Sequence, residues 1–172
     1  HYADTLNREP ATGYQKAILA YEDGDFKTCI GLCNEVAANQ EQTGSLFLLR
    51  GAARHQLGET ALAFADFNEA QRLTPDQPET FHNLSLLYFA TDKLGLAYRM
   101  INQALTLGNE HPETVYLLGN LKYAEGNYEE AIELYQLSLS YNPKLFKAHV
   151  QLALLHFQLE QDVQALVAIG EA

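Results

Sequence analysis

The chain has 172 residues, of which 47% are hydrophobic, so it holds enough apolar material for a packed domain. Acidic side chains number 22 against 11 basic ones, and the formal net charge is −11. This balance excludes a nucleic-acid partner, because phosphate binding needs a basic face. No apolar run reaches the roughly 18 residues that a membrane-spanning helix needs, so no membrane span is expected.

The chain repeats itself every 34 residues from residue 10 to residue 172, without insertions. Positions within each unit are numbered as places 1 to 34. The period separates an N-terminal extension, 1–9, from five units, the last incomplete: 10–43, 44–77, 78–111, 112–145 and 146–172. A sustained period of this length indicates stacked helical units that bury their cores against neighbours.

Small residues recur at two places of the unit, which indicates close approach of helix backbones. Place 8 carries Ala17, Gly51, Ser85, Gly119 and Ala153. Place 20 carries Cys29, Ala63, Ala97, Ala131 and Ala165. A turn-forming column stands between them at place 15, with Gly24, Gly58, Asp92, Gly126 and Glu160. Pro75 and Pro143 lie near the ends of two units. Each unit is therefore predicted to be two helices separated by a tight turn.

This pattern resembles the tetratricopeptide repeat family, whose unit is a helix-turn-helix of the same length. The fourth unit matches best, through Leu118, Gly119, Gly126, Tyr128, Ala131, Tyr135 and Pro143. There are departures: the family's large aromatic at place 4 appears as Gly13, Phe47, Phe81, Val115 and His149, the chain has no Trp, and Glu41 and Asn109 replace the proline. The resemblance implies an all-α, right-handed superhelical solenoid whose first helices line a concave inner face.

Places 5, 9 and 12 of each first helix lie on one stripe, and this stripe is rich in aromatic and apolar residues. Since the opposite stripe is also largely apolar, we expect one stripe to pack in the stack and the other to face the groove. The predicted groove residues are Tyr14, Tyr21, Leu48, His55, His82, Asn83, Phe89, Tyr116, Asn120, Tyr123 and Phe157. Aromatic rings supply contact area and amides can hold a peptide backbone. The alternative is that neighbouring groove residues cover one another.

These features favour a protein-protein interaction scaffold that binds a peptide or helix of basic or apolar character. The sequence has no phosphate-binding glycine loop, HExxH or GxSxG motif, so neither enzymatic activity nor a cofactor is expected. Two alternatives stay open. The chain is either a self-assembling or domain-bridging structural module, or the substrate-selecting segment of a larger protein.

The resemblance also bears on one known ligand class. A subset of the family holds the C-terminal carboxylate of chaperones with Lys and Asn at places 5 and 9, followed by further Asn, Lys and Arg residues. Place 5 here carries Tyr14, Leu48, His82, Tyr116 and Val150. The carboxylate clamp is therefore absent, and a chaperone-tail adaptor is disfavoured.

Two further groups of residues allow more than one interpretation. Cys29 and Cys33 are expected to pack as small core residues, because an i, i+4 disulfide would be strained and no zinc-ligand pair accompanies them. Arg50 and Arg54 either snorkel or pair with an acid such as Asp66, or they form a docking site for an acidic partner.

The histidines and the end of the chain add two expectations. His55 and His82 would share a surface if first helices pack side by side, which suggests a metal or proton-sensitive site.

By the repeat register the chain ends within a second helix, after the apolar run Leu166 to Ile169 and without a polar cap. The chain also begins at His1 rather than Met. Either the natural protein continues, or a homo-oligomer covers the uncapped C-terminal end.

Overall fold

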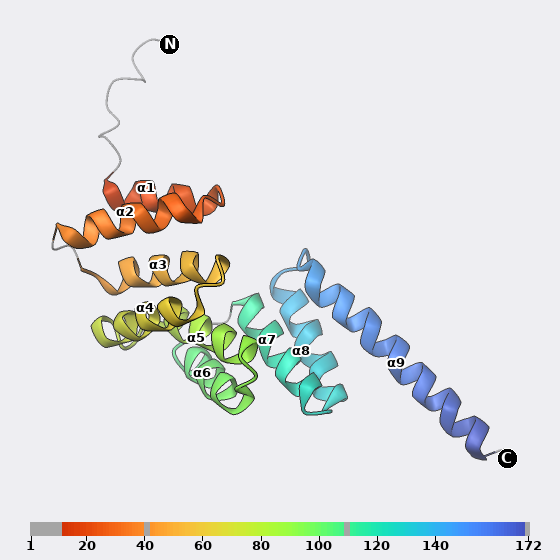
Figure 1. The fold of residues 1–172 in the computed structure, drawn as a ribbon. Coiled ribbons are helices and arrows are strands. Elements are labelled where there is room, and N and C mark those ends of the chain that lie inside the picture. Colours follow the sequence, from red (N-terminus) through yellow and green to blue (C-terminus); the bar gives the residue numbers. More distant parts are fainter. Residues whose placement is uncertain (1–11, 40–41, 109–110, 171–172) are drawn as a thin grey trace, which may run out of the picture.

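The computed structural model describes residues 12–39, 42–108 and 111–170, with side chains as far as residue 160. The extension 1–9, Pro10, Glu41 and Asn109 lie outside these ranges. Within them the regular structure is entirely helical (Figure 1). The helices are α1 (Gly13–Glu22), α2 (Phe26–Ala38), α3 (Gly44–Gln56), α4 (Thr60–Leu73), α5 (Pro78–Ala90), α6 (Leu94–Thr106), α7 (Pro112–Ala124), α8 (Tyr128–Tyr141) and α9 (Phe146–Gly170).

Helices α1 to α8 form four successive hairpins that stack one on the next (Figure 1). The first helices α3, α5, α7 and α9 begin at Gly44, Pro78, Pro112 and Phe146, which are the first places of the predicted units. The prediction of an all-α repeat solenoid is confirmed.

The helix starts follow from local chemistry. Thr12 and Gln15 form a reciprocal capping box at α1, and the Thr43 side chain accepts from the Leu46 N–H at α3. Pro78 and Pro112 open α5 and α7, where the missing N–H of proline has no helical partner to lose.

A left-handed residue at place 15 closes each of the four hairpins. The φ angles are 78° at Gly24, 75° at Gly58, 58° at Asp92 and 80° at Gly126. In every case the next N–H donates to the carbonyl at place 11: Asp25 to Ala20, Glu59 to Arg54, Lys93 to Tyr88 and Asn127 to Lys122. Glycine enters this conformation without the Cβ penalty of other residues, so place 15 ends the first helix and reverses the chain.

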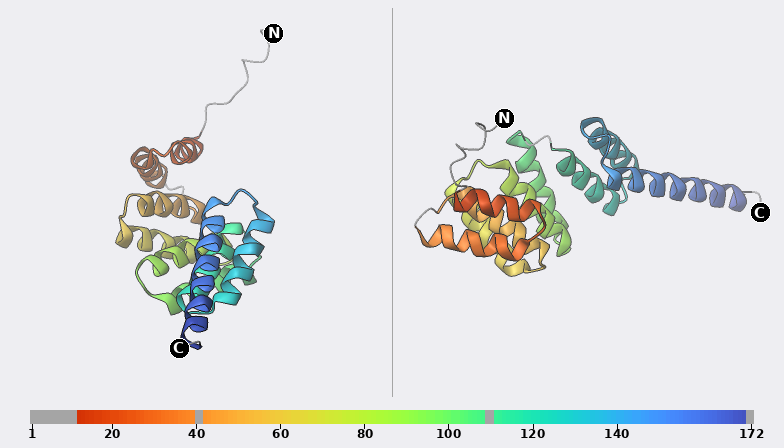
Figure 2. Two further views of the ribbon diagram at one scale, coloured as in Figure 1. Left: turned by 90° about the vertical axis from the view of Figure 1, so that its right-hand side faces the viewer. Right: turned by 90° about the horizontal axis from the view of Figure 1, so that it is seen from above.

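The fifth unit departs from the predicted helix-turn-helix. Glu160 stands at place 15, and α9 continues through it as one helix of 25 residues from Phe146 to Gly170. The left-handed conformation is sterically unfavourable for glutamate, which has a Cβ, and glutamate is stable in a helix interior. The turn therefore does not form. The C-terminal half of α9 extends away from α8 (Figures 1 and 2). The prediction of a turn at this place is wrong.

The small residues at places 8 and 20 lie at the helix contacts. Ala63, Ala97 and Ala131 are fully buried at place 20. At place 8, a Cβ added to Gly51 would lie 2.6 Å from the Phe67 ring, and one added to Gly119 would lie 2.7 Å from the Tyr135 ring. Glycine at place 8 therefore makes room for an aromatic ring at place 24.

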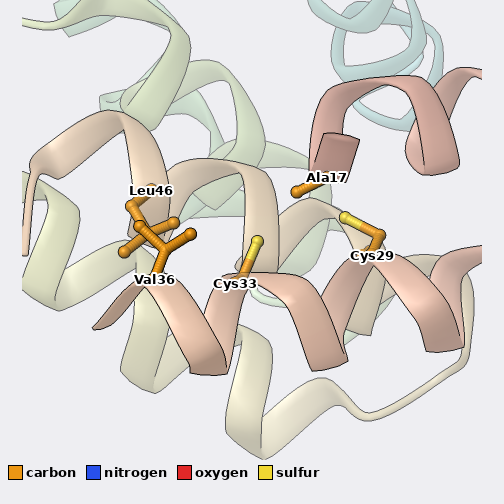
Figure 3. Packing of buried hydrophobic residues seen from close by; sticks show 6 residues of the cluster. Ala17, Cys29, Cys33, Val36 and Leu46 are labelled. Atoms are coloured by element: carbon orange, nitrogen blue, oxygen red, sulfur yellow. The ribbon is translucent and has the colours of Figure 1, made fainter. Parts of the chain in front are cut away.

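The first unit uses its two cysteines as core residues, as predicted. Cys29 and Cys33 are buried free thiols that pack with Ala17, Val36 and Leu46 (Figure 3). Burial raises the pKa of Cys33 to about 12, so its thiol stays protonated at neutral pH.

The second unit buries a carboxylate between two arginines. Asp66 is 3% exposed and accepts hydrogen bonds from Arg50 Nη2 at 2.6 Å and from Arg54 Nη1 at 2.7 Å. Arg50 Nη1 also donates to Asn34 Oδ1 of α2 at 2.8 Å, which links the first unit to the second. The predicted pairing with Asp66 is therefore confirmed, and it engages both guanidinium groups inside the fold.

Candidate peptide-binding groove

The first helices α1, α3 and α5 line a groove of about 310 Å³. Four predicted groove residues meet in it: Tyr14, Tyr21, Leu48 and Asn83. The other lining residues are Ser45, Leu49, Ala52, Gln77 and Glu79. The lining of the groove thus combines aromatic and aliphatic side chains with polar groups.

Local hydrogen bonds hold the polar groups of this groove in place. The Tyr14 hydroxyl donates to the Ser45 carbonyl at 3.4 Å, and Asn83 Nδ2 donates to the Glu79 carbonyl at 2.8 Å. Burial raises the pKa of both Tyr14 and Tyr21, so their phenols are neutral at physiological pH. Glu79 is the carboxylate among the lining residues.

Sequence reasoning missed the part of the groove made by helix starts. Ser45 and Glu79 stand at place 2 of their units, and Gln77 is the residue before α5. A second depression of about 440 Å³, lined by Ser45 and residues 73–77, shares Ser45 and Gln77 with the groove. These residues could have been predicted from the sequence. In a first helix that begins at place 1, place 2 lies about one helical turn before place 5 and therefore on the same face.

The predicted residues of the fourth unit contact their own second helix. The Tyr116 and Tyr135 rings lie 5.6 Å apart, and so do the Tyr123 and Tyr128 rings. The Tyr135 hydroxyl donates to Asn120 Oδ1 at 2.9 Å. Tyr123 keeps 38% of its surface exposed. Tyr116 and Asn120 are thus partly covered by Tyr135 of the second helix, which is not one of the predicted groove residues.

His82 lies at the contact between the third and fourth units. Its Nδ1 lies 3.0 Å from Thr114 Oγ1 of α7. Burial lowers the pKa of His82 to about 4, with further lowering by His111 and Lys147 against an opposing effect of Glu113. His82 is therefore neutral at pH 7 and serves as a hydrogen-bonding group.

The remaining predicted residues are dispersed. Phe89 packs against the cluster around Ala97 and Ile101. His55 is half-buried, and burial lowers its pKa. Phe157 of α9 is 61% exposed. The structure brings four of the predicted residues into one groove and leaves the others along the array.

Membrane spans and metal sites are both missing from the described residues. None of their helices is long and apolar enough to span a membrane. Across the same ranges, no group of three or more His, Cys, Asp or Glu side chains is placed to hold a metal ion.

The sequence is similar to known repeat proteins. A family model described as TPR repeat matches residues 119–160. The mouse (Mus musculus) BBSome complex member BBS4 is 31% identical over 134 residues, which cover 77% of this chain and 24% of that protein. The chain thus spans about a quarter of the length of this curated relative.

Solved structures share the fold. TTC0263, a thermophilic TPR protein of Thermus thermophilus, superposes with a TM-score of 0.71 at 20% identity, over 84% of this chain and 80% of that one. The first TPR of Spaghetti (RPAP3), bound to an HSP90 peptide, gives a TM-score of 0.63 at 22% identity, over 69% and 94% of the two chains.

Proposed function

Because the chain is a member of the tetratricopeptide repeat family, whose fold is a protein-interaction scaffold, we propose that its groove on α1, α3 and α5 binds a segment of a partner protein. The observation that carries the proposal is the convergence of Tyr14, Tyr21, Leu48 and Asn83 on one depression of about 310 Å³. Such a surface offers rigid aromatic contact area beside a fixed amide, which suits an extended or helical peptide.

The chemistry of the groove favours an apolar or basic segment. Its lining carries the carboxylate of Glu79 and neutral phenols, and the whole chain has a net charge of −11. A basic segment would be attracted over long range by the acidic surface and met by Glu79 at the rim. Leu48 and the two tyrosine rings would then receive its apolar side chains.

The RPAP3 repeat domain provides a useful contrast. Its structure holds the HSP90 peptide SRMEEVD, an acidic segment. Here, place 5 of the first two units carries Tyr14 and Leu48 instead of a basic residue. We therefore propose a different class of ligand, recognised through side chains within the segment.

The groove extends toward the C-terminal end of the array in this proposal. Tyr116, Asn120 and Tyr123 follow the same stripe of α7, and Tyr123 is 38% exposed. Phe89, His55 and His82 would line the connection between the two parts, with Phe157 beyond them. The principal contacts are assigned to the N-terminal part, where the four predicted residues converge.

The test begins with the full chain as bait in an extract of the source organism, followed by affinity measurement with the purified partner. Truncating Tyr21 or Leu48 to alanine should cost on the order of 1 to 3 kcal/mol of binding free energy if either is a hot spot. Leu62→Ala is the matched control, since Leu62 is 49% exposed on α4, outside the groove lining. Unchanged affinity in folded Tyr21→Ala and Leu48→Ala variants would contradict the assignment.

The similarity to BBS4 supports a second candidate function. That protein is a member of a complex, so this chain would serve as a structural subunit that bridges neighbours in an assembly. Sedimentation equilibrium of the purified chain distinguishes self-assembly from partner binding. A mass that rises with concentration favours a self-assembling module, and a constant monomer mass favours recruitment of other proteins.

A further inference from the structure

The groove on α1, α3 and α5 continues into the second depression, because Ser45 and Gln77 line both. The groove has a volume of about 310 Å³ and the second depression about 440 Å³. We call the two parts together the extended groove. It runs from the first helices of the first three units to the turn between α4 and α5. A ligand can therefore place one side chain in each part.

Each part of the extended groove contains one carboxylate. Asp76 lines the second depression and Glu79 lines the groove, with Gln77, which lines both, between them in the chain. Both acids are exposed, and neither makes an ion pair within the described part of the chain. None of the residues that line the two parts is Lys, Arg or His. Two unpaired carboxylates beside apolar side chains favour a ligand that carries a positive charge.

The turn between α4 and α5 fixes the backbone that carries Asp76. The Gln77 N–H donates to the Thr74 carbonyl at 3.3 Å, and Pro75 stands at the second position of this turn. Proline is favoured at that position because its ring fixes φ near the value that the turn needs. Asp76 thus lies on a rigid segment, so little backbone order is lost when a ligand meets its carboxylate.

The last junction of the array has the same turn but the opposite charges. The backbone hydrogen bond that closes the turn between α8 and α9 is 3.1 Å long. Place 33 is Asp76 before α5 and Lys144 before α9, and place 2 is Glu79 on α5 and Lys147 on α9. The repeat therefore accepts either sign at both places. The acidic pair is not required by the fold, and it distinguishes the extended groove from the equivalent surface at the other end of the array.

Two amide side chains offer hydrogen bonds to a peptide backbone. Asn83 Nδ2 donates to the Glu79 carbonyl at 2.8 Å, which leaves Asn83 Oδ1 as an acceptor. Gln77 Oε1 lies 3.2 Å from Thr74 Oγ1, which leaves Gln77 Nε2 as a donor. A helical peptide satisfies most of its own N–H and C=O groups, whereas an extended peptide presents them to its receptor. The pair of amides therefore suits an extended ligand.

We propose that the extended groove binds an extended segment of a partner protein in which aliphatic residues are followed or preceded by Lys or Arg. The aliphatic side chains contact Tyr21 and Leu48, and the basic side chains pair with Asp76 and Glu79. This inference rests on the proposed function of the groove and names its ligand. Side chains on one side of an extended chain recur at every second residue, so the ligand alternates recognised and outward-facing residues.

The probe is a peptide with blocked termini and the sequence Gly-Leu-Ser-Leu-Ser-Lys-Ser-Arg-Gly, together with the same residues in reverse order. One side of each peptide, when extended, presents two leucines and two basic residues. Titration of the isotope-labelled full chain, followed by two-dimensional NMR, should give a Kd on the order of 100 µM for one of the two directions. Replacing its Lys and Arg with Glu, or its two leucines with Ser, should weaken binding at least about tenfold.

Variants of the chain test the charge at its predicted place. Asp76→Lys with Glu79→Lys copies the charges of the last junction, so it should keep the fold and bind the glutamate peptide more tightly than the basic one. Asp76→Asn with Glu79→Gln should weaken the basic peptide about fivefold and abolish the dependence of its Kd on salt up to about 0.5 M NaCl. The matched control is Glu35→Lys with Glu129→Lys, which changes the net charge equally at two exposed acids outside the lining. It should leave the Kd within about twofold.

Three results would overturn the proposal. They are the absence of saturable binding of either basic peptide at millimolar concentration, equal affinity for the basic and glutamate peptides, and equal weakening by the control pair and by the Asp76 and Glu79 variants. If affinity is independent of peptide charge but falls in Tyr21→Ala and Leu48→Ala, the groove binds peptides and only the basic specificity is wrong. If neither of these alanine variants changes the affinity of a bound peptide, the groove itself is not the site.

Discussion

Replacing Asp66 with alanine should destabilise the array by about 4 kcal/mol, because removal of one partner from a buried charge network costs roughly 3–5 kcal/mol. Asp66 is 3% exposed, and the side chains of Arg50 and Arg54 are only 15% and 14% exposed. The alanine variant would remove the buried anion that both guanidinium groups share between α3 and α4, and Arg54 would keep only the 3.9 Å contact of its Nε with the Glu59 carboxylate. Water has little access to compensate them.

The geometry of the network supports a value near the middle of that range. Arg50 binds Asp66 through two nitrogens, with Nε to Oδ2 at 3.0 Å and Nη2 to Oδ1 at 2.6 Å. Arg54 adds a third bond at 2.7 Å. For a protein of this size about 1 kcal/mol corresponds to roughly 2–4 °C, so the melting temperature should fall by about 8–16 °C.

The third unit supplies the matched rescue. At the places of Arg50, Arg54 and Asp66 it carries the apolar residues Leu84, Tyr88 and Met100. The triple variant Arg50→Leu, Arg54→Tyr, Asp66→Met copies that arrangement. It should return the free energy of unfolding to within about 1 kcal/mol of wild type or above it, because well-packed apolar residues commonly replace a buried ion network without loss.

Urea unfolding followed by far-UV circular dichroism measures all variants under one condition. Glu69→Ala is the control, since Glu69 pairs with Arg72 on the surface and should leave the midpoint unchanged. The reasoning is refuted if Asp66→Ala unfolds at the wild-type midpoint, or if the triple variant is less stable than Asp66→Ala.

Three further predictions concern the third unit and its contact with the fourth. Lowering the pH from 7 to 4 should remove about 3 kcal/mol of stability through His82, because unfolded histidine binds its proton near pH 6.5 while folded His82 does so near pH 4. A His82→Leu variant should lose correspondingly less in urea titrations across this range, and an identical loss would exclude the mechanism. Thr80→Val should keep or raise stability by up to about 1 kcal/mol, because Thr80 Oγ1 is buried without a hydrogen-bond partner. Thr114→Val should lower stability by about 1 kcal/mol through loss of the 3.0 Å contact with His82, and equal urea midpoints for the two valine variants would contradict this distinction.

The repeat register predicted the helical architecture well for a physical reason. Each place occurs once in every unit, so the recurrence of a small residue at place 20 indicates the same environment in each unit. Ala63, Ala97 and Ala131 stand at this place, and all three are fully buried. A single segment could not separate such a contact from chance. The pairing of Arg50 and Arg54 with Asp66 was likewise predictable, because buried charges need partners.

The groove was only partly predictable. A stripe at places 5, 9 and 12 faces both the inner surface and the second helix of the same unit, and periodicity cannot say which contact dominates. Tyr14 and Leu48 line the groove, whereas Tyr116 stacks near Tyr135. Which of the two contacts forms is decided by tertiary packing, which the period does not encode.

The fifth unit shows how the residue at place 15 changes the surface of one helix, α9. Where place 15 is left-handed, as at Gly126, the chain reverses and the second helix covers the first. Where it is Glu160, the helix continues and the equivalent face stays open, with Leu154 57% exposed. From sequence alone Leu154 has the pattern of a groove or core residue. Its exposure could not be predicted, because it depends on whether a turn forms six residues further on. The exposed apolar face of α9 is therefore a consequence of the backbone conformation at place 15.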